Sequence, residues 1–169
     1  MIYLLGKRLD FPDPNDAEEN GLLAYGGDLS PERLLAAYAQ GIFPWPHDES
    51  DPLLWFSPDP RTVLLPDQVH LSRSLKKVMN KQDFEVRFDT TFREVITACA
   101  TVRRKGTHGT WITGEIIDAY CHLHDLGFAH SIETWKNGTL VGGLYGISLG
   151  AAFFGESMFT HGNNGSKIA

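Results

Sequence analysis

From about residue 61 onward, hydrophobic and polar positions follow regular patterns along the chain. Alternation with a period of two predicts a strand, and apolar residues recurring every three or four positions predict a helix. The expected elements are strands over Thr62–Leu65 and Phe84–Phe88, and helices over Ser72–Met79, from Thr91 to about Val102, and over Gly114–Leu126. In the first of these helices we expect the apolar residues Leu71, Leu75, Val78 and Met79 to face inward. In the second, Thr91 and Glu94 have the spacing of a capping box.

The dipeptide Asn137-Gly138 is typical of a two-residue hairpin turn, because both residues tolerate positive φ angles. It lies between two segments that predict strands, Ser131–Lys136 and Thr139–Leu149. The second part of the chain therefore reads as a strand, then helices, then a meander of strands.

The first 60 residues are rich in proline, glycine and aspartate and predict one helix. Ser30 is a suitable N-cap and Pro31 suits the first helical position; an apolar stripe follows and Gly41 ends the helix. The proline-containing segments Ile42–Pro46 and Trp55–Pro60 predict rigid aromatic loops, either for binding or for packing. We expect a domain boundary near Arg61, with domains over residues 1–61 and 62–169.

Glu156 stands out because it lies between bulky apolar side chains in Phe154-Gly-Glu-Ser-Met-Phe159, after a run that reads as a buried strand. Removing a carboxylate from water is costly, so such a group either has a function or has a structural partner, for which Arg61 and Lys167 are candidates. Gly146 lies with Gly142 and Gly143 inside a strand pattern, which indicates a ligand-facing bulge or close packing.

Composition narrows the class of protein. The chain has 169 residues, 42% of them hydrophobic, enough for a packed core. No apolar run approaches the roughly 18 residues needed to span a bilayer. The N-terminus does not resemble a secretory signal, and two cysteines form no disulfide framework, so we expect a cytoplasmic protein.

The net charge of −6 is unevenly distributed. Residues 1–62 carry 4 basic and 11 acidic side chains, whereas residues 70–105 carry 9 basic and 4 acidic ones. The basic stretch indicates either a surface for a polyanion or a solvated helix face.

The tryptophans are candidates for stacking on nucleobases, and the histidines are candidates for binding a metal. Trp45 and Trp111 lie in predicted loops, where flat rings can stack on nucleobases, while Trp55 and Trp135 fit a core pattern. His122 and His124 are two apart on a predicted helix and cannot share a metal there, so we interpret the histidines as structural.

Several segments together resemble the bacterial leucyl/phenylalanyl-tRNA–protein transferases. The resemblance runs colinearly from about residue 10 to residue 159, through the segments Asn20–Trp45 (ending GIFPW), Phe56–Arg61, Ser72–Lys77, Gly109–Thr113 (GTWIT), His124–Trp135, Val141–Gly146 and Phe154–Phe159.

The resemblance implies an α+β fold: a small N-terminal domain followed by a GNAT-like acyltransferase domain with a mixed, mostly antiparallel sheet flanked by helices. It implies an aminoacyltransferase that moves leucine or phenylalanine, sometimes methionine, from aminoacyl-tRNA to proteins beginning with arginine or lysine, marking them for degradation by the N-end rule. It implies no metal, coenzyme A or other cofactor and no membrane partner.

The resemblance also assigns roles to residues. The terminal adenine of the tRNA would stack on Trp45 and Trp111. An apolar pocket for the amino-acid side chain would contain Leu144, Phe153, Gly155 and Met158. Glu156 would be the catalytic carboxylate that receives the cationic acceptor, and the tRNA phosphates would bind Arg73, Lys76, Lys77 and Lys81.

An Asp-x-Gln pair, proposed in the family to deprotonate the attacking amine, has no counterpart in these 169 residues. Ser166–Ala169 also reads as the first turn of a helix, so we expect a C-terminally incomplete fold and a chain that is inactive or weakly active alone. Two alternatives remain: a tRNA-binding remnant without catalysis, and a GNAT-type N-acetyltransferase, for which no glycine-rich pyrophosphate turn is present.

Overall fold

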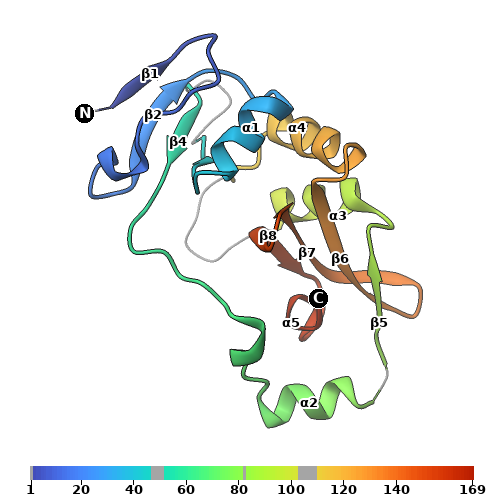
Figure 1. Ribbon diagram of the computed structural model, residues 1–169. Helices are drawn as coiled ribbons and strands as arrows, with labels where there is room; N and C mark the ends of the chain where they lie inside the picture. Colours follow the sequence, from blue (N-terminus) through green and yellow to red (C-terminus); the bar gives the residue numbers. More distant parts are fainter. Residues whose placement is uncertain (1, 47–51, 82, 103–109) are drawn as a thin grey trace. The chain divides into compact units, whose positions relative to one another are not determined.

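The computed structural model describes residues 2–46, 52–81, 83–102 and 110–169 (Figure 1). The chain divides into two compact units. One consists of Met1–Thr62 with Gly106–Leu123, and the other of Val63–Lys105 with His124–Ala169.

The first unit contains a four-stranded mixed sheet. Its strands are β1 (Tyr3–Leu5), β2 (Leu22–Gly26), β3 (Phe43–Pro44) and β4 (Leu54–Phe56), in the order β1-β2-β4-β3. β1 runs parallel to β2, and the remaining pairs are antiparallel. Trp55 on β4 is fully buried, and its indole N–H donates to the Gly26 carbonyl at 2.9 Å.

The pairing of β3 with β4 corrects the prediction that Ile42–Pro46 and Trp55–Pro60 contain only loops. Phe43 pairs with Phe56, and Pro44 pairs with Trp55. Pro44 is tolerated because β3 is at the edge of the sheet, where a residue without an N–H need not break a hydrogen bond to a second neighbour.

The predicted first helix is confirmed as α1 (Pro31–Tyr38). Leu34 and Tyr38 are buried, and Gly41 follows with a φ of 73°. The Ser30 side chain does not cap the helix; its hydroxyl donates instead to Asp28 at 2.5 Å. Arg33 is also buried, and its guanidinium donates to the carbonyls of Gly6 and Arg8, which fastens α1 to the segment after β1.

Helix α4 (Gly114–Asp125) explains why residues 106–123 group with the N-terminal segment. The hydroxyls of Tyr38 on α1 and Tyr120 on α4 lie 2.5 Å apart, and both side chains are buried. The bounds of α4 match the predicted helix over Gly114–Leu126, and Gly127 follows in a left-handed conformation (φ 81°).

The second unit contains an antiparallel sheet in the order β5-β6-β7-β8. Its strands are β5 (Glu85–Phe88), β6 (Ala129–Lys136), β7 (Thr139–Leu149) and β8 (Ala152–Thr160). The predicted hairpin between β6 and β7 is confirmed, with Asn137 and Gly138 at φ angles of 50° and 73°. The α+β class is also confirmed.

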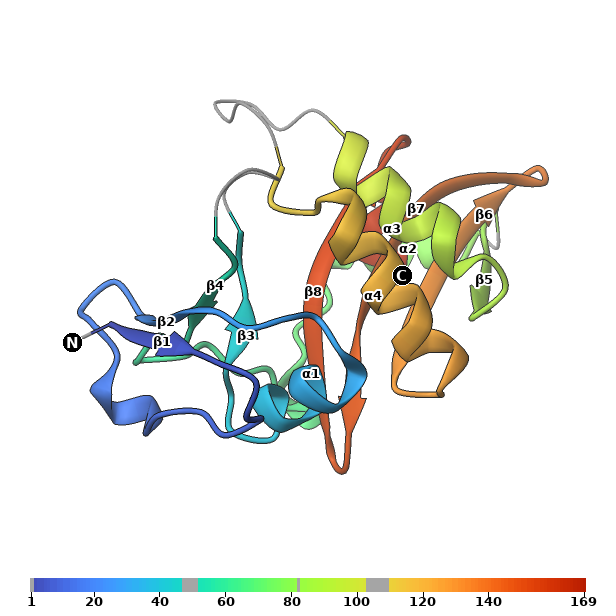
Figure 2. The ribbon, with the colours of Figure 1, turned by 90° about the horizontal axis from the view of Figure 1, so that it is seen from above.

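Two helices lie on opposite faces of this sheet. Helix α3 (Phe92–Thr101) lies across β6, β7 and β8 and buries Val95, Ile96 and Cys99 (Figure 2). The short α5 (Gly165–Ile168) covers part of the other face, where the backbones of Gly142 and Gly165 approach so closely that a Cβ on Gly142 would lie 2.4 Å from the Gly165 backbone.

The predicted capping box of α3 is wrong. Thr91 is the N-cap, but its side chain makes no capping bond. The fully buried carboxylate of Glu133 on β6 accepts the backbone N–H groups of Thr90 at 2.9 Å and Thr91 at 3.0 Å instead. The buried carboxylate of Glu133 on β6 therefore accepts the Thr91 N–H that the Glu94 side chain would accept in a capping box.

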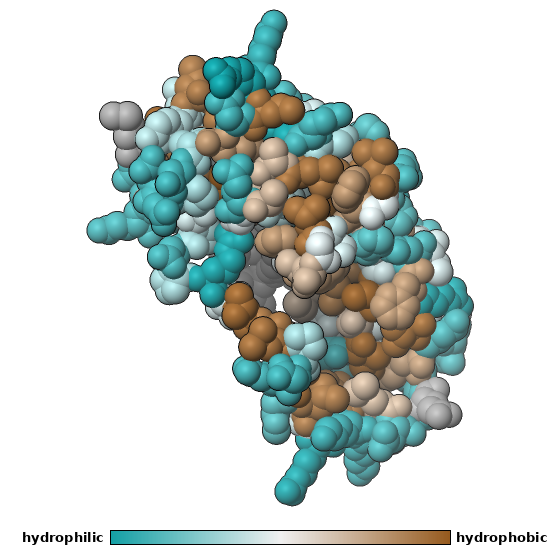
Figure 3. All heavy atoms as spheres, viewed as in Figure 1, coloured by the Kyte–Doolittle hydropathy of each residue, from teal (hydrophilic) through white to brown (hydrophobic). Residues whose placement is uncertain are grey.

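Two further expectations between residues 62 and 79 are wrong in part. Residues 62–65 form no strand, and Val63 and Leu64 are each 74% exposed. Helix α2 (Arg73–Met79), which follows a 3-10 turn at Pro66–Gln68, has the predicted position and the predicted cap, with Ser72 accepting from the Leu75 N–H at 3.2 Å. However, α2 fully buries none of its residues: of the residues predicted inward, Leu71, Leu75 and Val78 are half-buried and Met79 is exposed. Hydrophobic residues reach the surface on the face drawn in Figure 3.

In the part of the chain that the structure describes, no helix is long and apolar enough to cross a membrane.

Candidate functional site

The strand that carries Glu156 contains a β-bulge at that residue. Tyr145 on β7 pairs with Ser157 on β8, but the next residue, Gly146, pairs with Gly155. The register with β7 skips Glu156, which is therefore the extra residue of β8 at this bulge. A bulge of this kind bends the strand and changes the direction of the side chain it carries, and bulges are common beside functional sites.

The bulge also changes which residues of β8 share a face. Phe153 and Met158 are five positions apart, so a regular strand would place them on opposite faces. In the observed register Phe153 pairs with Ser148 and Met158 pairs with Leu144. Because cross-strand partners point to the same side and Ser148 and Leu144 share a face, Phe153 and Met158 also share that face.

This shared face is apolar and partly open to solvent. Leu144 is half-buried, while Phe153 and Met158 are 47% and 55% exposed. Gly155 pairs with Gly146 between them, and nothing lies within 4 Å of the position that a Cβ on Gly155 would occupy. The structure thus brings together Leu144, Phe153, Gly155 and Met158, with open space where Gly155 has no side chain.

The opposite face of the same two strands belongs to the core. Tyr145 and Ile147 on β7 and Phe159 on β8 are buried, and the Tyr145 ring meets Phe92 of α3 edge-on with ring centroids 5.9 Å apart. The apolar residues of β8 therefore divide into a packed set and an exposed set.

Glu156 is half-buried rather than enclosed, and β8 is the edge strand of its sheet. The prediction of a buried strand before Glu156 is wrong for the residues just before it, since Ala152 and Phe153 are exposed. A half-buried carboxylate beside an exposed apolar face is accessible to a cation from solvent. One of its suggested partners, Arg61, donates to the Gly41 carbonyl at 2.8 Å and lies over the Phe43 ring.

Trp45 and Trp111 both belong to the first unit. Trp45 is 43% exposed and meets the Phe56 ring edge-on at 5.5 Å between centroids. Trp111 is half-buried in the turn that opens α4, where the Thr113 N–H donates to its carbonyl at 3.1 Å. Neither ring is enclosed in the core, in contrast to Trp55. Trp135, which was expected in the core, is half-buried beneath the Arg87 guanidinium at 4.4 Å.

The basic residues expected to contact tRNA lie on or just after α2. Arg73, Lys76 and Lys77 are exposed on the helix, and Lys81 is exposed directly after its C-cap, Asn80. The spacing of three and four positions places Arg73, Lys76 and Lys77 on neighbouring parts of the helix surface. Three further residues of the basic stretch, Arg103, Arg104 and Lys105, lie outside the described residues.

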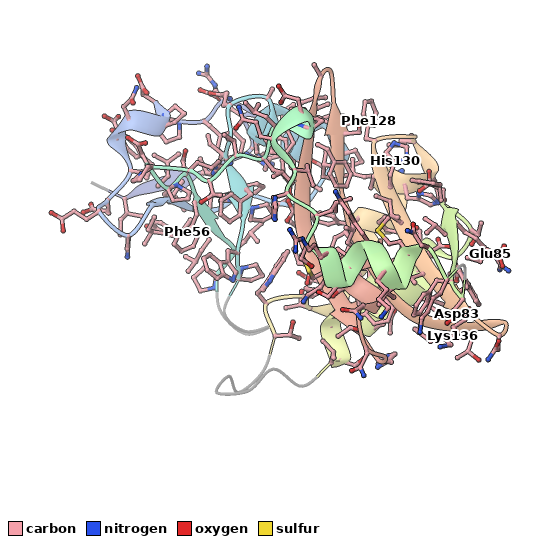
Figure 4. All side chains as sticks on the ribbon, turned by 90° about the horizontal axis from the view of Figure 1, so that it is seen from below. Phe56, Asp83, Glu85, Phe128, His130 and Lys136 are labelled. Carbon is pink, nitrogen blue, oxygen red and sulfur yellow. The ribbon has the colours of Figure 1, made fainter. Side chains whose placement is uncertain are left out.

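Two of the histidines, His130 on β6 and His124 on α4, have structural partners. His130, labelled in Figure 4, has its Nδ1 2.8 Å from an Asp89 carboxylate oxygen. His124 stacks on the Phe92 ring at 4.5 Å between centroids, and its Nδ1 lies 2.8 Å from the Ala129 carbonyl. Within the described ranges, no group of three or more His, Cys, Asp and Glu residues could hold a metal ion.

The sequence reasoning missed Glu133. Its carboxylate accepts from the Ser131 hydroxyl, the Trp135 indole and the hydroxyl of Thr90 as well as from two backbone N–H groups. Burial alone would raise the pKa of Glu133, but these hydrogen bonds outweigh burial and lower the pKa below its ordinary value. The signal that could have found it is a glutamate at an inward position of a predicted strand.

Comparison with known proteins identifies the family of the chain. A sequence model described as leucyl/phenylalanyl-tRNA protein transferase matches residues 63–169, and a model of the N-terminal domain of the same family matches residues 27–59. The chain belongs to the leucyl/phenylalanyl-tRNA–protein transferase family.

Members of this family from several bacteria are similar along the whole chain. The transferase of Myxococcus xanthus is 59% identical, covering 99% of this chain and 72% of the relative. That of Aromatoleum aromaticum is 58% identical, covering 100% of this chain and 71% of the relative. The transferase of Desulfatibacillum aliphaticivorans is 55% identical, covering 99% of this chain and 72% of the relative. The family consists of aminoacyltransferases, and the chain spans a little over 70% of each of these relatives.

Proposed function

We propose that this chain binds leucyl- or phenylalanyl-tRNA, with methionyl-tRNA as a further substrate, and takes part in transferring the amino acid to proteins that begin with arginine or lysine. The observation that carries the proposal is the bulged strand β8, which joins an apolar face to a half-buried carboxylate in a chain of this family.

The reaction replaces an ester by a peptide bond. The α-amine of the acceptor attacks the ester carbonyl, the ester C–O bond breaks, and the 3′-oxygen of the tRNA leaves with a proton while the amine loses one. The ester is already activated, so the protein mainly has to position the two substrates.

The apolar face suits the side chain that is transferred. Leu144, Phe153 and Met158 supply apolar contacts, and the space beside Gly155 admits a side chain from the ligand. Selection by size in such a pocket amounts to about 1–3 kcal/mol for each methylene. This agrees with a preference for a few apolar amino acids rather than for one.

Glu156 is the candidate for the acceptor's cationic end. A carboxylate in a half-buried position attracts a guanidinium or ammonium more strongly than one in bulk water. In this proposal, Glu156 binds the arginine or lysine of the acceptor and holds its amine near the ester.

The tRNA would contact both units. The rings of Trp45 and Trp111 are exposed or half-exposed and suit stacking of the terminal adenine. The cations of α2 with Lys81 suit phosphates of the acceptor stem, an interaction that carries little sequence preference.

The proposal also covers the domain organisation of the protein, its compartment, the fate of its products and its need for cofactors. We propose that residues 62–169 form a GNAT-like domain and residues 1–61 a small N-terminal domain; the antiparallel sheet flanked by α3 and α5 supports the former. We also propose that the protein acts in the cytoplasm, that its products are degraded by the N-end rule, and that it needs no metal or coenzyme.

The test measures transfer of labelled phenylalanine from its tRNA to a peptide that begins with arginine. It compares the chain alone with a chimera that adds the part of the Myxococcus xanthus relative which this chain does not match. We expect transfer by the chimera and at most weak transfer by the chain alone. No transfer by the chimera would contradict the proposal; tRNA binding without transfer would favour a tRNA-binding protein, and binding of acetyl-coenzyme A would favour an acetyltransferase.

A further inference from the structure

Gly146 lies directly opposite the bulge. It is buried on β7, and it pairs with Gly155, the residue just before Glu156. A Cβ added to Gly146 would lie 2.2 Å from the carbonyl oxygen of Phe154 and 2.6 Å from the nearest carbon of the Phe153 ring. No side-chain atom fits at these distances without movement of β8.

Space, not backbone conformation, is what requires glycine at this position. The φ of Gly146 lies outside the left-handed region, so alanine could adopt the same backbone angles. The closest obstacle is a backbone carbonyl, which cannot rotate away as the end of a flexible side chain can.

The other two glycines of the same strand have different neighbours. A Cβ on Gly142 would meet the backbone of Gly165, and one on Gly143 would meet the Ile132 carbonyl and the Phe159 ring. Their lack of a side chain is explained by packing against α5, β6 and the core. Gly146 alone of the three faces the bulged part of β8.

We propose that Gly146 is a positioning residue for the site: by leaving room for the Phe154 carbonyl and the Phe153 ring, it allows the bulge at Glu156. The bulge in turn presents the carboxylate and places Phe153 and Met158 on the face of Leu144. The use of this face for a substrate rests on the proposed function, but the dependence of the bulge on Gly146 does not.

A thermal-unfolding cycle tests the dependence without any substrate. Deletion of Glu156 would leave Gly155 and Ser157 adjacent, opposite Gly146 and Tyr145, and so convert the bulge into a regular ladder with every other residue on its present face. We expect Gly146→Ala to lower the melting temperature by roughly 4–10 °C in the wild type and by less than about 2 °C when Glu156 is deleted. Amide hydrogen exchange in β7 and β8 locates the change.

Two further variants separate the causes. Gly155→Ala is the matched control, because its Cβ meets open space, and we expect its melting temperature to stay within about 2 °C of the wild type. Equal destabilisation by Gly146→Ala with and without Glu156 would overturn the proposal. The proposal would also be overturned if Phe153→Ala fully restored the melting temperature of the Gly146→Ala variant, because Gly146 would then be needed only to make room for the Phe153 ring and not for the bulge.

A transfer assay on the chimera adds the functional consequence. We expect Gly146→Ala to lower kcat/KM for phenylalanyl transfer at a temperature where the protein remains folded. Failure of the unfolding cycle would refute the role of Gly146, whereas absence of transfer by the unmutated chimera would refute the proposed function.

Discussion

Glu133 shows how a single buried side chain can hold an element of the second unit in place. Its two oxygens receive five hydrogen bonds from Thr90, Thr91, Ser131 and Trp135. Two of these come from the backbone N–H groups of the N-cap residue Thr91 and of Thr90 just before it, and the N-cap N–H has no partner within the helix. The carboxylate thus couples the helix terminus to the inner face of β6.

The lowered pKa of Glu133 predicts loss of stability in acid. A carboxyl whose pKa is lower in the folded than in the unfolded chain stabilises the fold fully above its unfolded value, about 4.3. This contribution is lost as the pH falls below the unfolded value and through the lower pKa of the folded state. We expect Glu133→Gln to lower the free energy of unfolding at pH 7 by about 1–3 kcal/mol, because an amide places donors against donors, and to weaken the acid dependence in urea titrations.

Glu94→Gln is the matched control for this prediction. Glu94 is exposed in the first turn of α3, and it is the residue that the sequence assigned to a capping box. We expect a change of less than about 0.5 kcal/mol. A larger effect of Glu94→Gln than of Glu133→Gln would show that the local box, and not the buried carboxylate, caps the helix.

The exposed ring of Trp45 predicts a binding effect without a folding effect. Trp45→Ala should weaken binding of phenylalanyl-tRNA by about 1–3 kcal/mol if the ring stacks on one base, and Trp111→Ala should do the same. Fluorescence titration with labelled tRNA measures this, and circular dichroism checks the fold. Unchanged affinity in both variants would remove the tryptophans from the site.

Among the elements, those with strong local signals were predictable. The turn residues Asn137-Gly138 determine the β6–β7 hairpin through their positive φ angles, and Gly41 and Gly127 mark the ends of α1 and α4. Pairing of β3 with β4 was not predictable, because a proline at a sheet edge looks locally like a proline in a loop. The strand expected at residues 62–65 failed because a short apolar run does not specify a partner.

The bulge in β8 explains why the candidate site could be proposed by resemblance but not by periodicity. Counting by two along β8 separates Phe153 from Met158, and only the register with β7 brings them onto one face. The lack of space beside Gly146 likewise depends on a neighbouring strand. Sequence spacing alone carries neither fact.

Helix α2 has a prediction of its own, because its cations are exposed and it buries no residue. If Lys76 and Lys77 contact phosphates, replacing either by alanine should reduce the slope of log K against log salt for tRNA binding by about 1. Lys7→Ala, an exposed lysine of the first unit, is the control and should leave the slope unchanged. A slope unaffected by Lys76→Ala and Lys77→Ala would make α2 a solvated face.

At the scale of the whole molecule, the candidate residues are divided between the two units. Trp45 and Trp111 belong to the first, while Glu156, the apolar face and α2 belong to the second. A tRNA that uses all of them would therefore have to bind both units at once. Charge is also unevenly distributed, because residues 1–62 carry 11 acidic and 4 basic side chains whereas residues 70–105 carry 4 acidic and 9 basic ones.

The most direct measurement compares phenylalanyl transfer by the chimera to two peptides that differ only in beginning with arginine or with alanine. We predict that the wild type prefers the arginine peptide and that Glu156→Gln lowers kcat/KM for it by roughly 10–100-fold, with a much smaller change for the alanine peptide. An arginine preference that survives Glu156→Gln undiminished would contradict the account.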